Sequence, residues 1–221
     1  MRPRSDFYED FGLSGYTKYV HSPFVAPDEA GCLDMADLLF EREGRVYAQE
    51  VLEDTRRLVL SALPDDVLST LWLAATRAHF EPAQAGLGIR VWLSQIADTC
   101  TAFVRQDDPA FIPGDPIPAD QPELREAVLA ELRTSGPSLA EAAVTNLYAP
   151  PLPNLVRSLE LAINELGSDL GLRLYLRSMK AYFVPIGPAQ LQRLRKLGSK
   201  LGYHPCVVGD GNLNIWSDLE G

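Results

Sequence analysis

The sequence predicts a mainly α-helical fold, in which a body of about six helices precedes a small C-terminal module of α/β or helix–hairpin type. Two observations predict the helical body. Apolar residues recur at intervals of three and four through much of residues 32–167, and proline or glycine residues separate these stretches. The C-terminal module is predicted because one strong helical pattern after residue 168 lies among short apolar runs and turn residues.

The composition is that of an ordinary folded domain. Of the 221 residues, 46% are apolar and 23% are charged, and both values are near the average for globular domains. Three isolated cysteines form no disulfide framework and no metal-binding pair. No apolar run approaches the ~20 residues of a membrane span, and residues 1–10 lack the apolar stretch of a secretory signal. We therefore expect a cytoplasmic protein with no membrane partner.

Residues 1–31 are predicted to form an aromatic N-terminal arm. Disordered tails are poor in aromatic residues, so we expect this arm to dock on another surface. That surface is either the protein's own core or a partner. The candidates for partner docking are Phe7, Tyr8, Phe11, Tyr16 and Tyr19.

An acidic helical subdomain is predicted over residues 32–106. Its clearest pattern runs from Ile89 to Val104, where the apolar residues step by three and four and indicate one face packed on a core. Pro64 followed by two aspartates predicts the start of another helix, because acidic residues in a first turn complement the helix dipole. The helical stretches are residues 34–43, 45–63, 65–80 and 89–104.

A proline-rich connector is predicted over residues 107–122, which contain five prolines. Proline fixes φ and removes a hydrogen-bond donor, so no regular element is expected there. A second helical segment follows over residues 123–167. Gly136-Pro137 is expected to end its first helix, Ser138 with Glu141 forms a capping box for the next, and Gly167 stops a third helix that Asn154 caps.

Residues 168–221 are predicted to form a basic strand–helix–hairpin module. Leucines alternate with other residues over 170–177, which indicates a strand, but a helix capped by Ser168 fits equally well and both remain open. A strand is predicted over 181–186 and a helix over 188–201. A Gly-Asp-Gly-Asn turn between two short apolar runs predicts a β-hairpin at 206–216.

Charge is unevenly distributed along the chain. The net charge is −10, yet residues 1–150 contain 24 acidic against 12 basic residues, whereas residues 171–209 contain seven basic residues and no acidic one. Such asymmetry bears on partners rather than on fold. The candidate contacts for an anion or a nucleic acid are Arg173, Arg177, Arg193, Arg195, Lys196 and Lys200.

The helix predicted over 188–201 is the strongest functional lead. It combines a leucine stripe with a neighbouring basic face, and a predicted hairpin follows it directly. This order resembles the recognition helix and wing of a winged helix–turn–helix domain, which implies contact with nucleic-acid phosphates. The resemblance covers only about 30 residues, and residues 181–187 intervene where a short turn belongs. An ordinary amphipathic helix that covers a small sheet is the other interpretation.

No catalytic, cofactor-binding or metal-binding motif is present: P-loop, GxSxG, HExxH and dinucleotide fingerprints are all missing. The leading hypothesis is therefore a non-catalytic interaction or regulatory protein that acts through protein–protein contacts or self-association, with no cofactor. A nucleic-acid-binding regulator that uses the basic helix is the alternative. A third hypothesis is an enzyme whose site assembles from distant segments, with His79, Asp34 and Asp37 as candidates.

Overall fold

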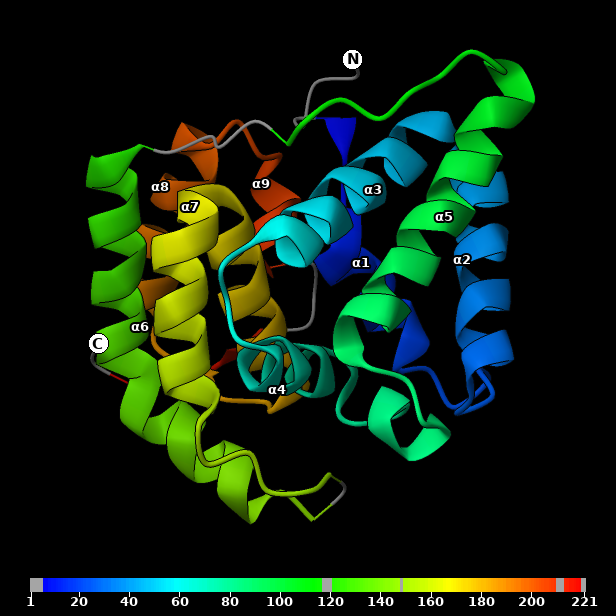
Figure 1. The fold of residues 1–221 in the computed structure, drawn as a ribbon. Helices are drawn as coiled ribbons and strands as arrows, with labels where there is room; N and C mark the ends of the chain where they lie inside the picture. Colours follow the sequence, from blue (N-terminus) through cyan, green and yellow to red (C-terminus); the bar gives the residue numbers. More distant parts are fainter. Residues whose placement is uncertain (1–5, 117–120, 148, 210–212, 220–221) are drawn as a thin grey trace. The chain divides into compact units, whose positions relative to one another are not determined.

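The computed structural model describes residues 6–116, 121–147, 149–209 and 213–219. These residues contain nine α-helices and one small parallel sheet near the C-terminus, which confirms the mainly helical prediction (Figure 1). The chain divides into two compact units, an acidic unit of Phe11–Pro118 and a C-terminal unit of Met1–Asp10 with Ala119–Gly221. None of the described helices combines the length and the apolar character that crossing a membrane requires.

The acidic unit is a helical bundle in which α5 packs along α3 and α2. Trp92 of α5 is fully buried and meets Trp72 and Phe80 edge to face, so the stripe predicted from Ile89 to Val104 does face a core. The elements are α1 (Gly12–Val20), α2 (Glu29–Glu43), α3 (Arg45–Leu60), α4 (Asp65–Thr76), the 3₁₀ turn η2 (Pro82–Ala85) and α5 (Ile89–Asp107).

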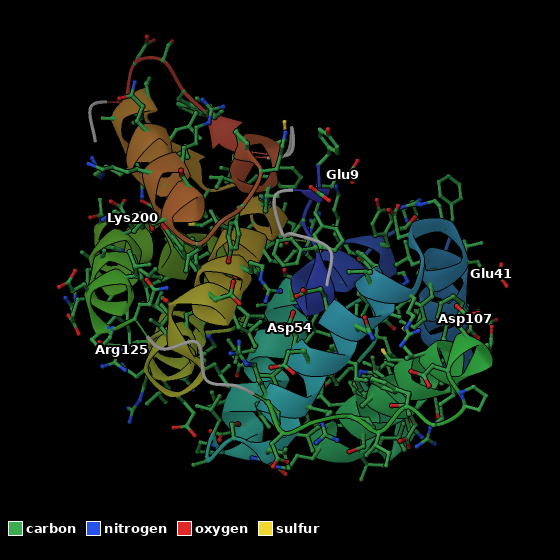
Figure 2. All side chains as sticks on the ribbon, turned by 90° about the horizontal axis from the view of Figure 1, so that it is seen from above. Glu9, Glu41, Asp54, Asp107, Arg125 and Lys200 are labelled. Atoms are coloured by element: carbon green, nitrogen blue, oxygen red, sulfur yellow. The ribbon has the colours of Figure 1, made fainter. Side chains whose placement is uncertain are left out.

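Two polar contacts hold helix ends within this unit. Helix α1 has no side-chain cap of its own, and the carboxylate of Asp54 on α3 (Figure 2) accepts a hydrogen bond from the Leu13 N–H at 2.9 Å. At the C-terminal end of α3, the partly buried Arg90 guanidinium donates to the Val59 carbonyl, and it also donates to the Leu63 carbonyl in the loop that follows. Each contact satisfies backbone groups that a helix end leaves without partners.

The aromatic residues predicted for an N-terminal arm have different environments. Phe11 and Tyr16 are buried with α1 in the core of the acidic unit, and the Tyr16 hydroxyl donates to the Cys32 carbonyl at 2.8 Å. Tyr19 is partly exposed beneath the Arg42 guanidinium. In the C-terminal unit Phe7 is buried, whereas Tyr8 is 68% exposed. Of the five candidate docking residues, the three that are buried in the protein itself are Phe7, Phe11 and Tyr16.

The C-terminal unit is built on two long helices, α6 (Pro122–Thr145) and α7 (Leu155–Ala181), which pack against each other (Figure 1). The prediction that Gly136-Pro137 ends a helix is wrong, because α6 continues through Pro137 to Thr145. Proline inside a helix costs about 3 kcal/mol. Leu132 and Leu139, one on each side of the proline, are both buried, and their packing offsets that cost.

Helix α7 settles the open choice for residues 170–177 in favour of a helix. Gly167, with a φ of 84°, divides α7 into two helical halves, and every residue from Ser168 to Ala181 is buried. Because this half is buried on all sides, its leucines are not confined to one face, and its charged residues Asp169, Arg173 and Arg177, spaced by four, are buried as well. The alternating leucines therefore resembled a strand without forming one.

The predicted hairpin is also wrong. Residues Pro205–Gly209 form the short helix α9, and β2 (Asn214–Ile215) pairs in parallel with β1 (Pro185–Ile186). The strand predicted over 181–186 is shortened because α7 continues to Ala181 and the next residues turn back on its end, where the Val184 N–H donates to the Met179 carbonyl at 3.0 Å. Helix α8 (Pro188–Lys200) connects β1 to α9, so the module is of the α/β type. Of the turn predicted at residues 209–212, Gly209 belongs to α9 and residues 210–212 lie outside the described residues.

Candidate anion-binding pocket

Four of the seven basic residues between positions 171 and 209 are used inside the C-terminal unit. Arg173 is fully buried and pairs with Asp169 at 3.3 Å, and Arg177 is 4% exposed. The Lys180 ammonium donates to the Val207 carbonyl at 3.2 Å. On α8, Arg193 pairs with Glu131 of α6 at 2.6 Å. Of the predicted anion contacts, Arg173 and Arg177 are therefore not on the surface, and Arg193 is already paired.

The three remaining cations are Arg195, Lys196 and Lys200, all exposed on α8. Within the described part of the chain, none of the three side chains forms a hydrogen bond or an ion pair. Lys200 lies at the C-terminal end of the helix (Figure 2). Of the seven basic residues between positions 171 and 209, three therefore remain available to a ligand.

The leucine stripe predicted for this helix orients these cations. Leu191, Leu194 and Leu197 are buried, whereas Arg195 and Lys196 lie on the exposed side. Burial of a leucine side chain contributes about 1.5–3 kcal/mol, so the stripe sets which side of α8 faces the core. Because the leucine side faces the core, the side that carries Arg195 and Lys196 faces outward.

Two glycines shape the turn after α8. Gly202 adopts a φ of 77°, a conformation that glycine reaches without the strain of a Cβ. The Tyr203 N–H then donates back to the Gly198 carbonyl at 2.9 Å, and the Gly202 N–H to the Ser199 carbonyl at 3.1 Å. This Schellman motif turns Tyr203 across Gly198. The Tyr203 hydroxyl donates to the Asp169 carboxylate at 2.6 Å, which ties the turn to α7.

His204 directly precedes α9 and is held by two contacts. Its Nδ1 accepts a hydrogen bond from the Cys206 N–H at 3.2 Å, so the neutral ring carries its proton on Nε2. Its ring also meets that of Tyr8, with the ring centroids 4.4 Å apart. Tyr8 comes from the N-terminal segment of the same unit. The imidazole is therefore fixed in position and presents an N–H donor.

The end of α8, the turn and α9 enclose a pocket of about 420 Å³. Among the described residues, its lining contains two cations, a hydroxyl and an imidazole and no carboxylate, beside an apolar wall of a tyrosine ring, a proline and a valine. Such a lining offers N–H and O–H donors and positive charge to an anion. The lining residues are Arg195, Lys196, Gly198, Ser199, Tyr203, His204, Pro205 and Val208.

Sequence reasoning identified the two cations of this pocket but missed Ser199, Tyr203 and His204. The available signal was the pair Gly198 and Gly202, spaced four residues apart at the end of a helical pattern and followed by an aromatic residue. That spacing is typical of a helix that ends in a tight turn. It indicates that the next residues fold back beside the helix's last turn.

The residues considered for an enzyme, His79, Asp34 and Asp37, all belong to the acidic unit. The His79 Nε2 lies 2.8 Å from the Val25 carbonyl, a contact that holds a loop. Asp34 and Asp37 lie on the exposed side of α2. The remaining partial burial of the Asp37 carboxyl, and then the charges of Asp34 and Glu41, raise its pKa. The described residues also contain no group of three or more His, Cys, Asp or Glu side chains able to hold a metal.

No protein-family model, curated protein or solved structure matches this chain. The functional argument is therefore built on the pocket itself.

Proposed function

We propose that this chain is a non-catalytic interaction protein that binds an acidic segment of a partner protein through the pocket between α8 and α9. One observation carries the proposal. Arg195 and Lys196 meet in a pocket that also contains Ser199 and His204, and neither cation is paired with a described residue. Oppositely charged surfaces steer association and fix the register of two partners.

A protein partner is favoured over nucleic acid because the available charge is small and local. Nucleic-acid affinity at physiological salt depends on neutralising many phosphates along the backbone. Helix α8 offers only Arg195, Lys196 and Lys200, and the predicted wing is replaced by α9 and a parallel strand pair.

Self-association is one form that this contact can take. The acidic unit contains 16 acidic and 8 basic residues and is a possible source of the acidic segment in a second copy. Sedimentation velocity at low salt tests this form. Dimers that disappear in the double variant Arg195→Ala/Lys196→Ala support it, and a monomer at every concentration excludes it.

The general proposal is tested by fluorescence anisotropy with a labelled oligoglutamate peptide and a labelled single-stranded oligonucleotide of equal charge. We expect the peptide to bind, the affinity to fall with salt, and Arg195→Ala/Lys196→Ala to weaken it at least about tenfold. Arg133→Ala is the matched control, because Arg133 is an exposed arginine of the same unit outside the pocket. Tighter binding of the oligonucleotide, or an unaffected double variant, would overturn the proposal.

A further inference from the structure

We infer that the α8–α9 pocket selects a phosphate monoester carried on a side chain of the partner, in preference to a carboxylate. This inference rests on the proposed function and specifies the acidic group. Three properties of the pocket support it: its charge, its hydrogen-bond donors, and its size together with its apolar wall.

The charge of the lining matches a dianion. Arg195 and Lys196 supply two positive charges, and no described residue of the lining is a carboxylate that would offset them. A phosphorylated side chain carries about −1.5 to −2 at pH 7. A glutamate carries a single charge, as does each phosphodiester of a nucleic acid. A phosphate monoester therefore gains most from both cations.

The donors of the lining exceed what a carboxylate can use. Arginine presents N–H groups in a planar fork that binds phosphate oxygens in pairs, and lysine adds a compact ammonium. Ser199 contributes a hydroxyl, and His204 contributes the proton on Nε2 that follows from the contact between Nδ1 and the Cys206 N–H. A phosphate monoester has three strong acceptor oxygens, whereas a carboxylate has two. Four donor side chains therefore fit the phosphate better.

The pocket also has room for more than the charged group. Its volume of about 420 Å³ falls within the range of about 300–1,000 Å³ that is usual for ligand pockets. Tyr203, Pro205 and Val208 form an apolar wall. The ring centroid of Tyr8 lies 4.4 Å from that of His204. Apolar surface of this kind suits the carbon stem or the aromatic ring that carries the phosphate. A phosphorylated side chain thus fits better than inorganic phosphate.

The test uses one labelled peptide made in four versions, with phosphotyrosine, phosphoserine, glutamate or serine at its centre and neutral residues elsewhere. Phenyl phosphate serves as a free monoester that competes for the same site. We expect the full-length protein to bind a phosphorylated version at least about tenfold more tightly than the glutamate version. We expect phenyl phosphate to compete only at much higher concentration, because it lacks the flanking chain.

Variants separate the pocket from its surroundings. Arg195→Ala and Lys196→Ala should each weaken phosphopeptide binding about tenfold. Ser199→Ala should reduce the preference for phosphate over glutamate. Arg133→Ala should leave both affinities unchanged, because Arg133 does not line the pocket. All four positions are exposed, so unchanged circular dichroism spectra and melting temperatures can verify that the variants fold.

Each outcome bears on a different statement. If the glutamate version binds as tightly as the phosphorylated versions, phosphate selectivity is wrong while the proposed function stands. If no version binds, both are wrong. If phenyl phosphate binds as tightly as the phosphopeptides, the ligand is a small free monoester and the inference of a partner side chain is overturned.

Discussion

Arg193 of α8 and Glu131 of α6 form an ion pair in which the arginine Nε lies 2.6 Å from the glutamate Oε1. The Glu131 side chain is only 9% exposed, so the pair holds an almost buried carboxylate. Two positions further along, Arg195 has no such partner among the described residues and lines the pocket. Neighbouring arginines of one helix therefore have different roles, one in the fold and one available to a ligand.

This division predicts different stabilities for two alanine variants. Arg193→Ala should lower the free energy of unfolding by about 1–3 kcal/mol, because it leaves the nearly buried Glu131 carboxylate without its charged partner. Arg195→Ala should change it by less than about 0.5 kcal/mol, as is usual at a surface position. Urea unfolding of both variants measures the difference. Equal losses would contradict the assignment.

Tyr203 is expected to stabilise the turn below the pocket through its hydroxyl. Tyr203→Phe keeps the ring but removes the 2.6 Å hydrogen bond to the buried Asp169 carboxylate. Hydrogen bonds to charged groups contribute about 1.5–3 kcal/mol, so we expect a loss of that size in thermal or urea unfolding. Tyr8→Phe is the matched control, since Tyr8 is 68% exposed. A loss of similar size in both variants would show that the Asp169 contact is not the cause.

Gly198 is expected to be required for the packing that shapes the pocket. A Cβ at this position would lie 2.7 Å from Val208 Cγ2 and 3.3 Å from Tyr203 Cδ2. Gly198→Ala should therefore cost about 1–3 kcal/mol of stability and weaken binding of the phosphopeptide, although it removes no charge.

Gly114→Ala provides the contrast, since a Cβ there meets nothing within 4 Å. Alanine at a position that accepts it without strain stabilises a protein by roughly 0.4–1 kcal/mol, so this variant should be at least as stable as the wild type. Destabilisation by both alanines in differential scanning calorimetry would be inconsistent with a local clash at Gly198.

The three cysteines should differ sharply in reactivity. Burial raises the pKa of the Cys32 thiol to about 12, and burial also raises the pKa of Cys100, whereas Cys206 is exposed. The thiolate is the reactive species, so at about pH 8 only Cys206 should react quickly with Ellman's reagent. Unfolding in guanidinium should release all three thiols. Rapid reaction of native Cys206→Ser would refute this assignment.

The sequence alone determined the elements that have one polar and one apolar side. The stripes of α5 and α8 were readable because each helix buries a single face, and Gly202 marked the end of α8 because only glycine takes its φ of 77° without strain. The two cations of the pocket were found in the same way. These features depend on residues that are close together in the chain.

Only the tertiary structure decided the rest, because the deciding contacts come from distant segments. Packing on both sides of Pro137 keeps α6 continuous, and complete burial of the second half of α7 lets leucines occupy positions that alternate like those of a strand. Glu131, 62 positions from Arg193 in the chain, forms an ion pair with that arginine and so neutralises one charge of the basic side of α8. Tyr203 and His204 join Arg195 and Lys196 only when the chain folds back after α8. The sequence shows which residues are charged, but the fold determines which of these charges are paired within the protein.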